Sequence, residues 1–223
     1  MIANPFYLAR SGLLRELQEF FPELTGEILD VGCGTKPYRA FIPATRYVGL
    51  DIDNPETRRR GFADLFYDGT SFPLGDASFD GVLCSQVFEH VFRPRDFLAE
   101  IHRVLRPGGR LLLTVPFIWD EHEKPVDFGR YSSFGLRAVL TEAGFEVVAS
   151  RKSLADARAL FQLWNAYVYK VSRSRHRALN ALVTVGCMAP VTLLGLTLGR
   201  LLPRCDDLFL DNVVLARKRG SLP

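Results

Sequence analysis

Two glycines and two aspartates near the N-terminus have the spacing of a nucleoside-binding loop. Asp30 ends a short apolar run and is followed by Gly32 and Gly34, and Asp51 ends a second apolar run 21 residues after Asp30. Glycines let the backbone turn sharply off a strand and approach a ligand closely. A carboxylate at the next strand end can accept hydrogen bonds from both hydroxyls of a ribose. The pattern predicts a pocket for a nucleoside.

A dinucleotide is the first alternative for this pocket. The dinucleotide fingerprint needs a third glycine three positions after the second, and Pro37 stands there. Asp30, just before the glycine turn, would also repel a pyrophosphate. S-adenosylmethionine suits the loop better, because it carries a sulfonium and an α-ammonium and no phosphate.

Two histidines are candidate proton acceptors. His90 follows the fourth predicted strand, and His122 lies in the polar segment 116–131 after the fifth. Both positions belong to the edge where open α/β sheets bind ligands. A base close to a hydroxyl would assist its reaction, so we predict His122 as the base, with Asp127 orienting it or acting instead. His90 is the second candidate, although a packing role is its alternative. No set of metal ligands is predicted.

Short apolar runs bounded by Gly, Pro or Asp predict the buried strands of a parallel sheet. The runs are 28–31, 47–50, 62–67, 79–84 and 110–115, with later ones at 145–148 and 213–215. Helical spacing predicts helices over 13–21, 94–105 and from Ser132 or Ser133 to Ala143. This alternation predicts an α/β fold whose strand ends carry the functional residues.

Several longer motifs follow one another along the same region. They are Asp30-Val-Gly-Cys-Gly-Thr, Tyr47-Val-Gly-Leu-Asp51, Asp68-Gly-Thr-Ser-Phe-Pro-Leu, Ser78-Phe-Asp-Gly-Val-Leu-Cys, Glu89-His-Val and Glu100-Ile-His-Arg-Val-Leu-Arg-Pro-Gly-Gly. In this order they resemble the class I S-adenosylmethionine-dependent methyltransferases, in the small-molecule branch called the type 11 methyltransferase domain. The resemblance implies a Rossmann-like, seven-stranded, mostly parallel sheet with flanking helices and a late antiparallel hairpin. A helical insertion would precede the last strand.

The resemblance also implies how S-adenosylmethionine, the cofactor, is held. Gly32 and Gly34 would lie against its methionine part, with Asp30 supporting the loop or reaching the ammonium. Asp51 would bind the ribose diol, unless it only caps the turn after it. The remaining contacts would be Asp68 and Gly69 at the adenine, and Ser85 and Gln86 at the sulfur end. Asp64 is close enough to Asp68 to compete for its role. Lys36-Pro37, where relatives often carry Gly, departs from the pattern.

The segment around His122 resembles part of methyltransferases associated with bacterial surface glycans and lipid-linked intermediates. The resemblance implies that Arg130 and Tyr131 help to bind the acceptor. We therefore expect an S-adenosylmethionine-dependent methyltransferase of a small or lipid-linked, glycan-type acceptor, with O-methylation as the reaction. The alternatives are a methyltransferase of a quinone or other apolar metabolite, or a binding protein without turnover.

The chain of 223 residues divides into three predicted parts: an N-terminal helical segment 1–25, a methyltransferase domain 26–153 with 207–218, and an insertion 154–206. Residues 151–206 hold nine basic and two acidic side chains, a net +7, so the rest carries −4 of the total of +3. The cysteines lack CxxC spacing, which favours reduced thiols over a disulfide framework. No secretory signal is evident, so we expect a cytoplasmic protein that could be peripheral at the inner face of the membrane.

The insertion is apolar as well as basic. A helix is predicted over 155–171, then come the arginines of 173–177, and 178–199 contains no charge. Pro190 is expected to interrupt this run. A single membrane crossing would separate the strand near 213 from its sheet. A cap over the acceptor site, an oligomer surface and a contact with the membrane surface remain open. Nucleic acid is an unlikely partner for so apolar a segment.

Overall fold

The computed structural model describes residues 4–220, so the first three residues of the predicted N-terminal segment lie outside the described part. Contacts divide the chain into two compact units. The helical unit comprises the chain up to Glu16, the short stretch Ile118–Asp120 and residues 152–211. The sheet unit comprises 17–117, 121–151 and the chain from Asn212 onward.

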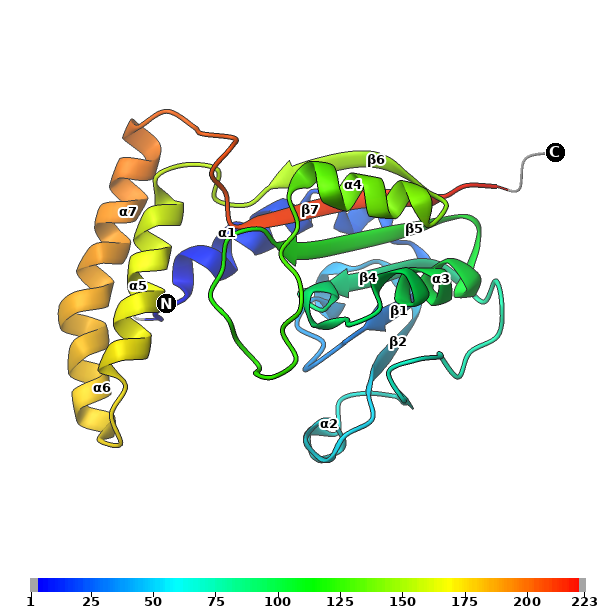
Figure 1. Ribbon diagram of the computed structural model, residues 1–223, viewed down its shortest axis with the longest axis horizontal. Helices are drawn as coiled ribbons and strands as arrows, with labels where there is room; N and C mark the ends of the chain where they lie inside the picture. The colour runs from blue at the N-terminus through cyan, green and yellow to red at the C-terminus, as the bar shows by residue number, and fades with distance from the viewer. Residues whose placement is uncertain (1–3, 221–223) are drawn as a thin grey trace. The chain divides into compact units, whose positions relative to one another are not determined.

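Seven strands form one sheet in the order β3-β2-β1-β4-β5-β7-β6 (Figure 1). Their bounds are β1 Gly26–Val31, β2 Ala44–Ile52, β3 Leu65–Tyr67, β4 Phe79–Ser85, β5 Leu105–Pro116, β6 Phe145–Lys152 and β7 Asp211–Lys218. The pairs β1–β2, β1–β4, β2–β3 and β4–β5 are parallel. The predicted fold class is confirmed. The last strand in the sequence, β7, lies between β5 and β6.

The centre of the sheet is the point where the strand order reverses, since β2 lies on one side of β1 and β4 on the other. Leu29, Val82 and Leu111 on the three central strands are fully buried, as expected for strands covered on both faces. Ligands of open α/β sheets bind at the carboxyl ends of the strands beside such a reversal. The ends of β1, β2 and β4 are therefore where the predicted pocket must lie.

Helices of the sheet unit are α2 Pro55–Arg60, α3 Pro94–Val104 and α4 Ser133–Glu142, and α3 and α4 lie over one face of the sheet (Figure 1). Short 3-10 turns occur at η1 Phe21–Glu23, η2 Arg39–Phe41 and η3 Phe88–His90. Ser132 begins α4 by accepting a hydrogen bond from the Gly135 N–H at 3.1 Å. The helix predicted over 13–21 was placed too late: α1 spans Tyr7–Gln18 and ends before Pro22, which takes part in η1.

The helical unit contains α5 Arg158–Ser172, α6 Arg177–Val183, the π-helical turn η4 Thr184–Met188 and α7 Ala189–Leu201. The expected interruption at Pro190 was wrong, because α6, η4 and α7 form one continuous helix. Pro190 lies in the first turn of α7, and the wider π turn just before it accommodates the missing N–H donor. By length and composition, 177–201 could cross a membrane; it is the only such helix among the described residues.

Candidate functional site

The glycine loop leaves the end of β1 through two residues in the left-handed region. Gly32 has φ +68° and Gly34 has φ +50°. A Cβ on Gly32 would lie 2.2 Å from the Val87 side chain, whereas a Cβ on Gly34 would meet nothing within 4 Å. Gly32 therefore keeps the loop close to the segment after β4, and Gly34 faces open space. A ligand can approach the backbone there, which is the fit that the sequence predicted.

Asp51 lies beside this loop at the end of β2. Its Oδ2 accepts a hydrogen bond from the Gly34 N–H at 3.2 Å, and its Oδ1 accepts one from the Ile52 N–H at 2.8 Å. Asp51, which is predicted to bind the ribose, is thus in direct contact with the glycine loop, which is predicted to lie against the methionine part of the cofactor. Ile52 itself is 42% exposed, so it offers an apolar surface next to the carboxylate. Ile52 was not among the predicted site residues, although its place directly after the strand-end carboxylate Asp51 could have indicated it.

Asp30, at the end of β1 just before the glycine loop, is buried. Its Oδ2 accepts a hydrogen bond from the Tyr47 hydroxyl at 2.6 Å. Burial raises the pKa of Asp30 to about 7, and the Tyr47 hydrogen bond opposes that rise. Tyr47 was missed in the sequence. Asp30 stands opposite Gly49 in the sheet, and Tyr47 is two residues before Gly49 on the same face, so the alternation of strand residues could have found it.

Asp68, rather than Asp64, stands at the carboxyl end of β3. The Asp68 Oδ1 accepts hydrogen bonds from the Thr70 N–H, the Thr70 hydroxyl and the Ser71 N–H at 2.8, 2.6 and 3.1 Å. These bonds lower the pKa of Asp68 to about 2. Asp64 comes before β3, where its Oδ2 accepts from Lys36 and from the Gly49 N–H. Gly69, with φ +89°, turns the loop beside Ile52.

The end of β4 is fixed to β5 through Thr114, which the sequence analysis also missed. The Thr114 hydroxyl lies 2.9 Å from the Ser85 hydroxyl and accepts from both the backbone and the side-chain N–H of Gln86, each at 3.1 Å. Gln86 has φ +58°, a conformation that turns the chain toward Val87 and the glycine loop. Val87, the next residue, lies against Gly32. The contact of Ser85 and Gln86 with the sulfur end of the cofactor stays a prediction.

A second cluster forms where η3 meets the loop after β5. His90 and His122 pack edge to face with ring centroids 4.7 Å apart, and their Nε2 atoms lie 3.9 and 4.0 Å from Oε1 of the fully buried Glu89. The His90 Nδ1 donates to the Val126 carbonyl at 2.6 Å. The Glu89 carbonyl accepts from the N–H groups of Phe128 and Gly129 at 2.8 and 3.1 Å. The loop is thus tied to the end of β4, and two histidines distant in sequence become neighbours.

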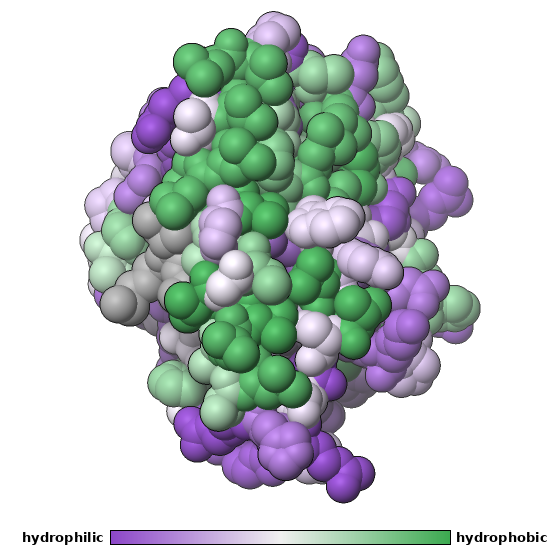
Figure 2. Space-filling model, turned by 90° about the vertical axis from the view of Figure 1, so that its left-hand side faces the viewer, coloured by the Kyte–Doolittle hydropathy of each residue, from purple (hydrophilic) through white to green (hydrophobic). Residues whose placement is uncertain are grey.

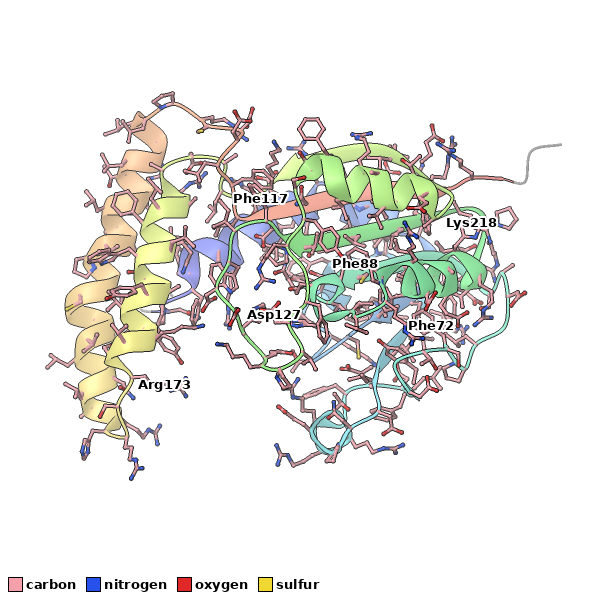
Figure 3. The ribbon with its side chains drawn as sticks, viewed as in Figure 1. Phe72, Phe88, Phe117, Asp127, Arg173 and Lys218 are labelled. Carbon is pink, nitrogen blue, oxygen red and sulfur yellow. The ribbon has the colours of Figure 1, made fainter. Side chains whose placement is uncertain are left out.

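Asp127 supports His122 from the opposite side. Its Oδ2 accepts from the His122 N–H at 2.9 Å and lies 3.4 Å from the His122 Nδ1. Arg130 donates to both carboxylate oxygens, at 2.6 and 2.8 Å. The pKa of Asp127 lies well below its usual range, first because of Arg130 and then because of the His122 N–H. Figure 3 labels Asp127 on the long loop after β5 and Phe88, the first residue of η3. The ring centroid of Phe88 lies 5.0 Å from that of Tyr131.

Comparison with known proteins decides the family. Residues 29–113 match the family model described as a methyltransferase domain. The chain is 30% identical over 166 residues to O-methyltransferase rstn1 of Aspergillus nomiae, a match that covers 63% of this chain and 74% of that enzyme. The chain belongs to the S-adenosylmethionine-dependent methyltransferases. S-adenosylmethionine is therefore the cofactor of this methyltransferase, and the loop geometry fits it.

Two further relatives bear on the protein. A fatty-acid O-methyltransferase of Mycolicibacterium smegmatis is 39% identical over 100 residues, covering 39% of this chain and 36% of that enzyme. The crystal structure of an S-adenosylmethionine-dependent methyltransferase from Mesorhizobium loti superposes with a TM-score of 0.58 at 16% identity, covering 92% of this chain and 97% of that one. The structural match supports the fold of the methyltransferase.

The Glu89, His90 and His122 ligand atoms lie within 4.8 Å of one another, a spacing that could hold a divalent cation. This possible metal site was not predicted from the sequence, because Glu89 was considered only as part of the Glu-His-Val motif. The three residues lie on two loops that are 32 positions apart, so only the fold brings them together. Proton acceptance and metal binding are the two candidate roles of this cluster, and they require different tests.

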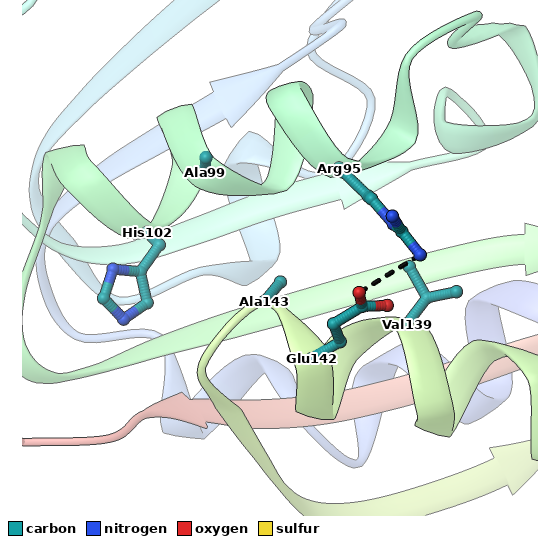
Figure 4. A pocket seen from close by; sticks show the side chains of 6 residues that line it. All are labelled: Arg95, Ala99, His102, Val139, Glu142 and Ala143. Carbon is teal, nitrogen blue, oxygen red and sulfur yellow. Dashed lines mark ion pairs between the residues drawn. The ribbon is translucent and has the colours of Figure 1, made fainter.

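A groove of about 370 Å³ lies between α3 and α4 (Figure 4). It is lined by Arg95, Ala99, His102, Val139, Glu142 and Ala143. Arg95 and Glu142 close one end with an ion pair of 3.1 Å. The His102 ring packs edge-on against Phe145 with centroids 5.4 Å apart, and burial lowers its pKa. The groove lies between helices rather than at the strand ends, and we assign His102 to helix packing in the methyltransferase.

Proposed function

We propose that this methyltransferase transfers a methyl group to an oxygen atom of a small or lipid-linked acceptor, with a glycan-type lipid intermediate as the favoured class. Bound S-adenosylmethionine supplies a methyl group already activated on a sulfonium. The protein then has to align the acceptor oxygen and remove its proton. The observation that carries this proposal is the pair of packed histidines, one of which has the ionised Asp127 beside its Nδ1. The His90 N–H donates to the carbonyl of Val87, the residue that a Cβ on Gly32 would meet.

His122 is the better base of the two. With its Nδ1 toward Asp127, the imidazole presents Nε2 as the proton acceptor, and the ionised Asp127 stabilises the imidazolium that results. Arg130 keeps Asp127 ionised and weakly basic, so we assign Asp127 to positioning rather than to proton removal. The His90 Nδ1 donates to a neutral carbonyl, and its Nε2 faces the carboxylates of Glu89 and Glu123 at 3.9 Å. Unlike His122, it has no carboxylate at Nδ1 to orient Nε2 as the acceptor. We assign His90 to packing against His122.

Tyr131 remains a proposed acceptor contact, whereas Arg130 is proposed to act through Asp127. Tyr131 is half-buried beside Phe88, so its ring can form one wall of an acceptor pocket. Arg130 uses both terminal nitrogens on Asp127, and its contribution to the acceptor would be indirect.

A lipid-linked acceptor is favoured over a water-soluble one by two observations. The helical unit exposes many large apolar side chains, and one relative is named as a fatty-acid O-methyltransferase. A quinone or other apolar metabolite would be served by the same surface and is the second candidate. We propose that the protein works in the cytoplasm at the inner face of the membrane.

The test is methyl transfer from radiolabelled S-adenosylmethionine to a total membrane lipid extract. We expect label in the organic phase for the wild-type protein, and a fall of roughly 100- to 10,000-fold for His122→Gln. His122→Gln should bind S-adenosylhomocysteine like the wild type, which separates loss of chemistry from loss of folding. Label found only in water-soluble products would contradict the lipid-linked acceptor, and full activity of His122→Gln would contradict the base.

A further inference from the structure

The helical unit contains a two-helix hairpin whose helices pack closely against each other. The hairpin consists of α5 and the continuous helix 177–201, and the two lie side by side in Figure 1. The buried Asn165 amide donates to the Thr192 hydroxyl at 2.9 Å and to the Met188 carbonyl at 3.3 Å. A Cβ on Gly195 would lie 2.9 Å from Phe161, so small residues let the helices approach closely. These contacts hold the two helices together.

The outer side of the hairpin is apolar and exposed. We call this set the apolar face, and its members are Leu160, Trp164, Tyr167, Val171, Leu179, Leu182, Val185, Leu193, Leu194 and Leu201. Trp164 is 56% and Leu182 is 68% exposed. The most apolar 18-residue stretch of helix 177–201 has a mean hydropathy of 2.0, and only 17% of that stretch is buried. The core helix of a soluble protein would be mostly buried, so this face needs an apolar partner.

Charge indicates what that partner is. From 157 to 205 the chain has seven basic residues and no acidic one. Arg173, Arg175 and Arg177 cluster where α5 gives way to α6, and Figure 3 labels Arg173 at that end of the hairpin. Figure 2 shows hydrophobic side chains gathered over the outer face, with hydrophilic ones along its lower edge. An apolar face bordered by arginines matches the surface of a bilayer that contains anionic lipid.

The other occupants fit less well. A second copy of this chain would bring the same cationic surface against itself in a symmetric dimer, without anions to compensate. A full crossing also fails. The 15 residues of α5 reach roughly 22 Å at about 1.5 Å per residue, less than the hydrocarbon core of about 30 Å. The chain could therefore not return through the bilayer to the sheet strand β7.

We propose that the apolar face binds the surface of anionic membranes, with its side chains at the boundary of headgroups and acyl chains and with Arg173, Arg175 and Arg177 among the phosphates. This binding is independent of the methyl acceptor. It places the protein on the bilayer surface rather than across it.

Flotation of the full chain with vesicles tests the proposal. The vesicles are pure phosphatidylcholine or phosphatidylcholine with 30% phosphatidylglycerol, an added lipid that supplies the negative charge. We expect co-flotation with the anionic vesicles, and at least a tenfold loss of binding for Trp164→Glu with Leu182→Glu. Arg175→Glu with Arg177→Glu should remove the preference for anionic vesicles. Phe134→Glu is the matched control, because Phe134 is 85% exposed on α4 outside the hairpin, and it should float like the wild type.

Two results would overturn the proposal. One is wild-type protein that binds S-adenosylhomocysteine, and is therefore folded, yet stays in the soluble fraction with both vesicle types. The other is a concentration-dependent dimer that the Trp164→Glu and Leu182→Glu changes dissociate while vesicle binding is unchanged. Loss of methyl transfer with intact flotation would contradict only the proposed function.

Discussion

Individual carboxylates in the sheet unit differ in role according to what surrounds them. Asp51 is bonded to the glycine loop, Asp68 caps its own turn, and Asp127 is held by an arginine. Asp30 differs from these because it is buried and has a raised pKa of about 7. Residue types and spacing singled out Asp30, Asp51 and Asp127, and the family resemblance singled out Asp68, but none of this predicted their partners. Tyr47 and Thr114 come from other strands, and only the register of the sheet brings them into contact.

Asp30→Asn should stabilise the ligand-free protein above pH 7. The pKa of Asp30 is about 7 when folded against a model value of 3.8, so the stability it contributes is present at acidic pH and is lost as pH rises through 7. The neutral amide avoids this loss and still accepts from Tyr47. Denaturant unfolding should show a gain on the order of 2 kcal/mol at pH 8 that shrinks toward pH 4. A gain that is the same at both pH values would contradict this assignment.

Treatment with a metal chelator distinguishes the two candidate roles of the Glu89, His90 and His122 cluster. If His122 acts as a base, protein treated with EDTA keeps its full methyl transfer activity. Asp127→Asn should then reduce turnover at least about tenfold by loosening the imidazole, with unchanged affinity for S-adenosylhomocysteine. Activity that EDTA abolishes and Zn²⁺ restores would instead make the histidines metal ligands.

Among the elements, the strand ends are the most predictable part and the loops between them the least. Five apolar runs bounded by Gly, Pro or Asp became β1 to β5. The central strands β1, β4 and β5 are buried on both faces, whereas β3 lies at an edge of the sheet. The helix boundaries were less certain, as α1 and the π turn before Pro190 show. A proline marks where a backbone donor is missing, but the chain can compensate by a wider turn rather than a break. The pairing of η3 with the loop 121–131 has no local signal, since it depends on contacts between distant segments.

Gly32→Ala should disable the cofactor loop. The added Cβ would need to occupy space 2.2 Å from Val87 at a φ of +68°, so the loop must move away from the segment after β4. We expect at least a tenfold weaker binding of S-adenosylhomocysteine by calorimetry. Gly75→Ala is the matched control, because its Cβ would meet nothing within 4 Å. Equal affinities for both variants would show that the close approach at Gly32 does not matter.

For the whole molecule, charge and hydropathy separate along the chain. The region 151–206 carries +7 while the remainder carries −4, and the exposed apolar side chains gather on the same region. The sequence indicated a basic, apolar insertion but left a cap, an oligomer surface and a membrane contact as alternatives. Exposure of the apolar face is what favours the membrane, and exposure cannot be read from composition.

Anionic vesicles should raise the rate of methyl transfer to a membrane lipid extract. Binding to the bilayer surface concentrates the protein where a lipid-linked acceptor resides. We expect this stimulation to disappear in the Trp164→Glu and Leu182→Glu variant, and the affinity for S-adenosylhomocysteine to stay the same with and without vesicles. Stimulation that persists in that variant would separate catalysis from the apolar face.

The most direct test of the cofactor site is calorimetric titration of S-adenosylhomocysteine into the wild type, Asp51→Asn and Asp53→Asn. Asp53 lies two residues after Asp51, just beyond the end of β2, and is paired with Arg58. It therefore serves as the control. Replacing a carboxylate that binds the ribose removes charge-assisted hydrogen bonds worth about 1.5–3 kcal/mol. We predict an affinity roughly 10- to 100-fold weaker for Asp51→Asn and unchanged for Asp53→Asn. Wild-type affinity in Asp51→Asn would contradict the placement of the nucleoside at the ends of β1 and β2.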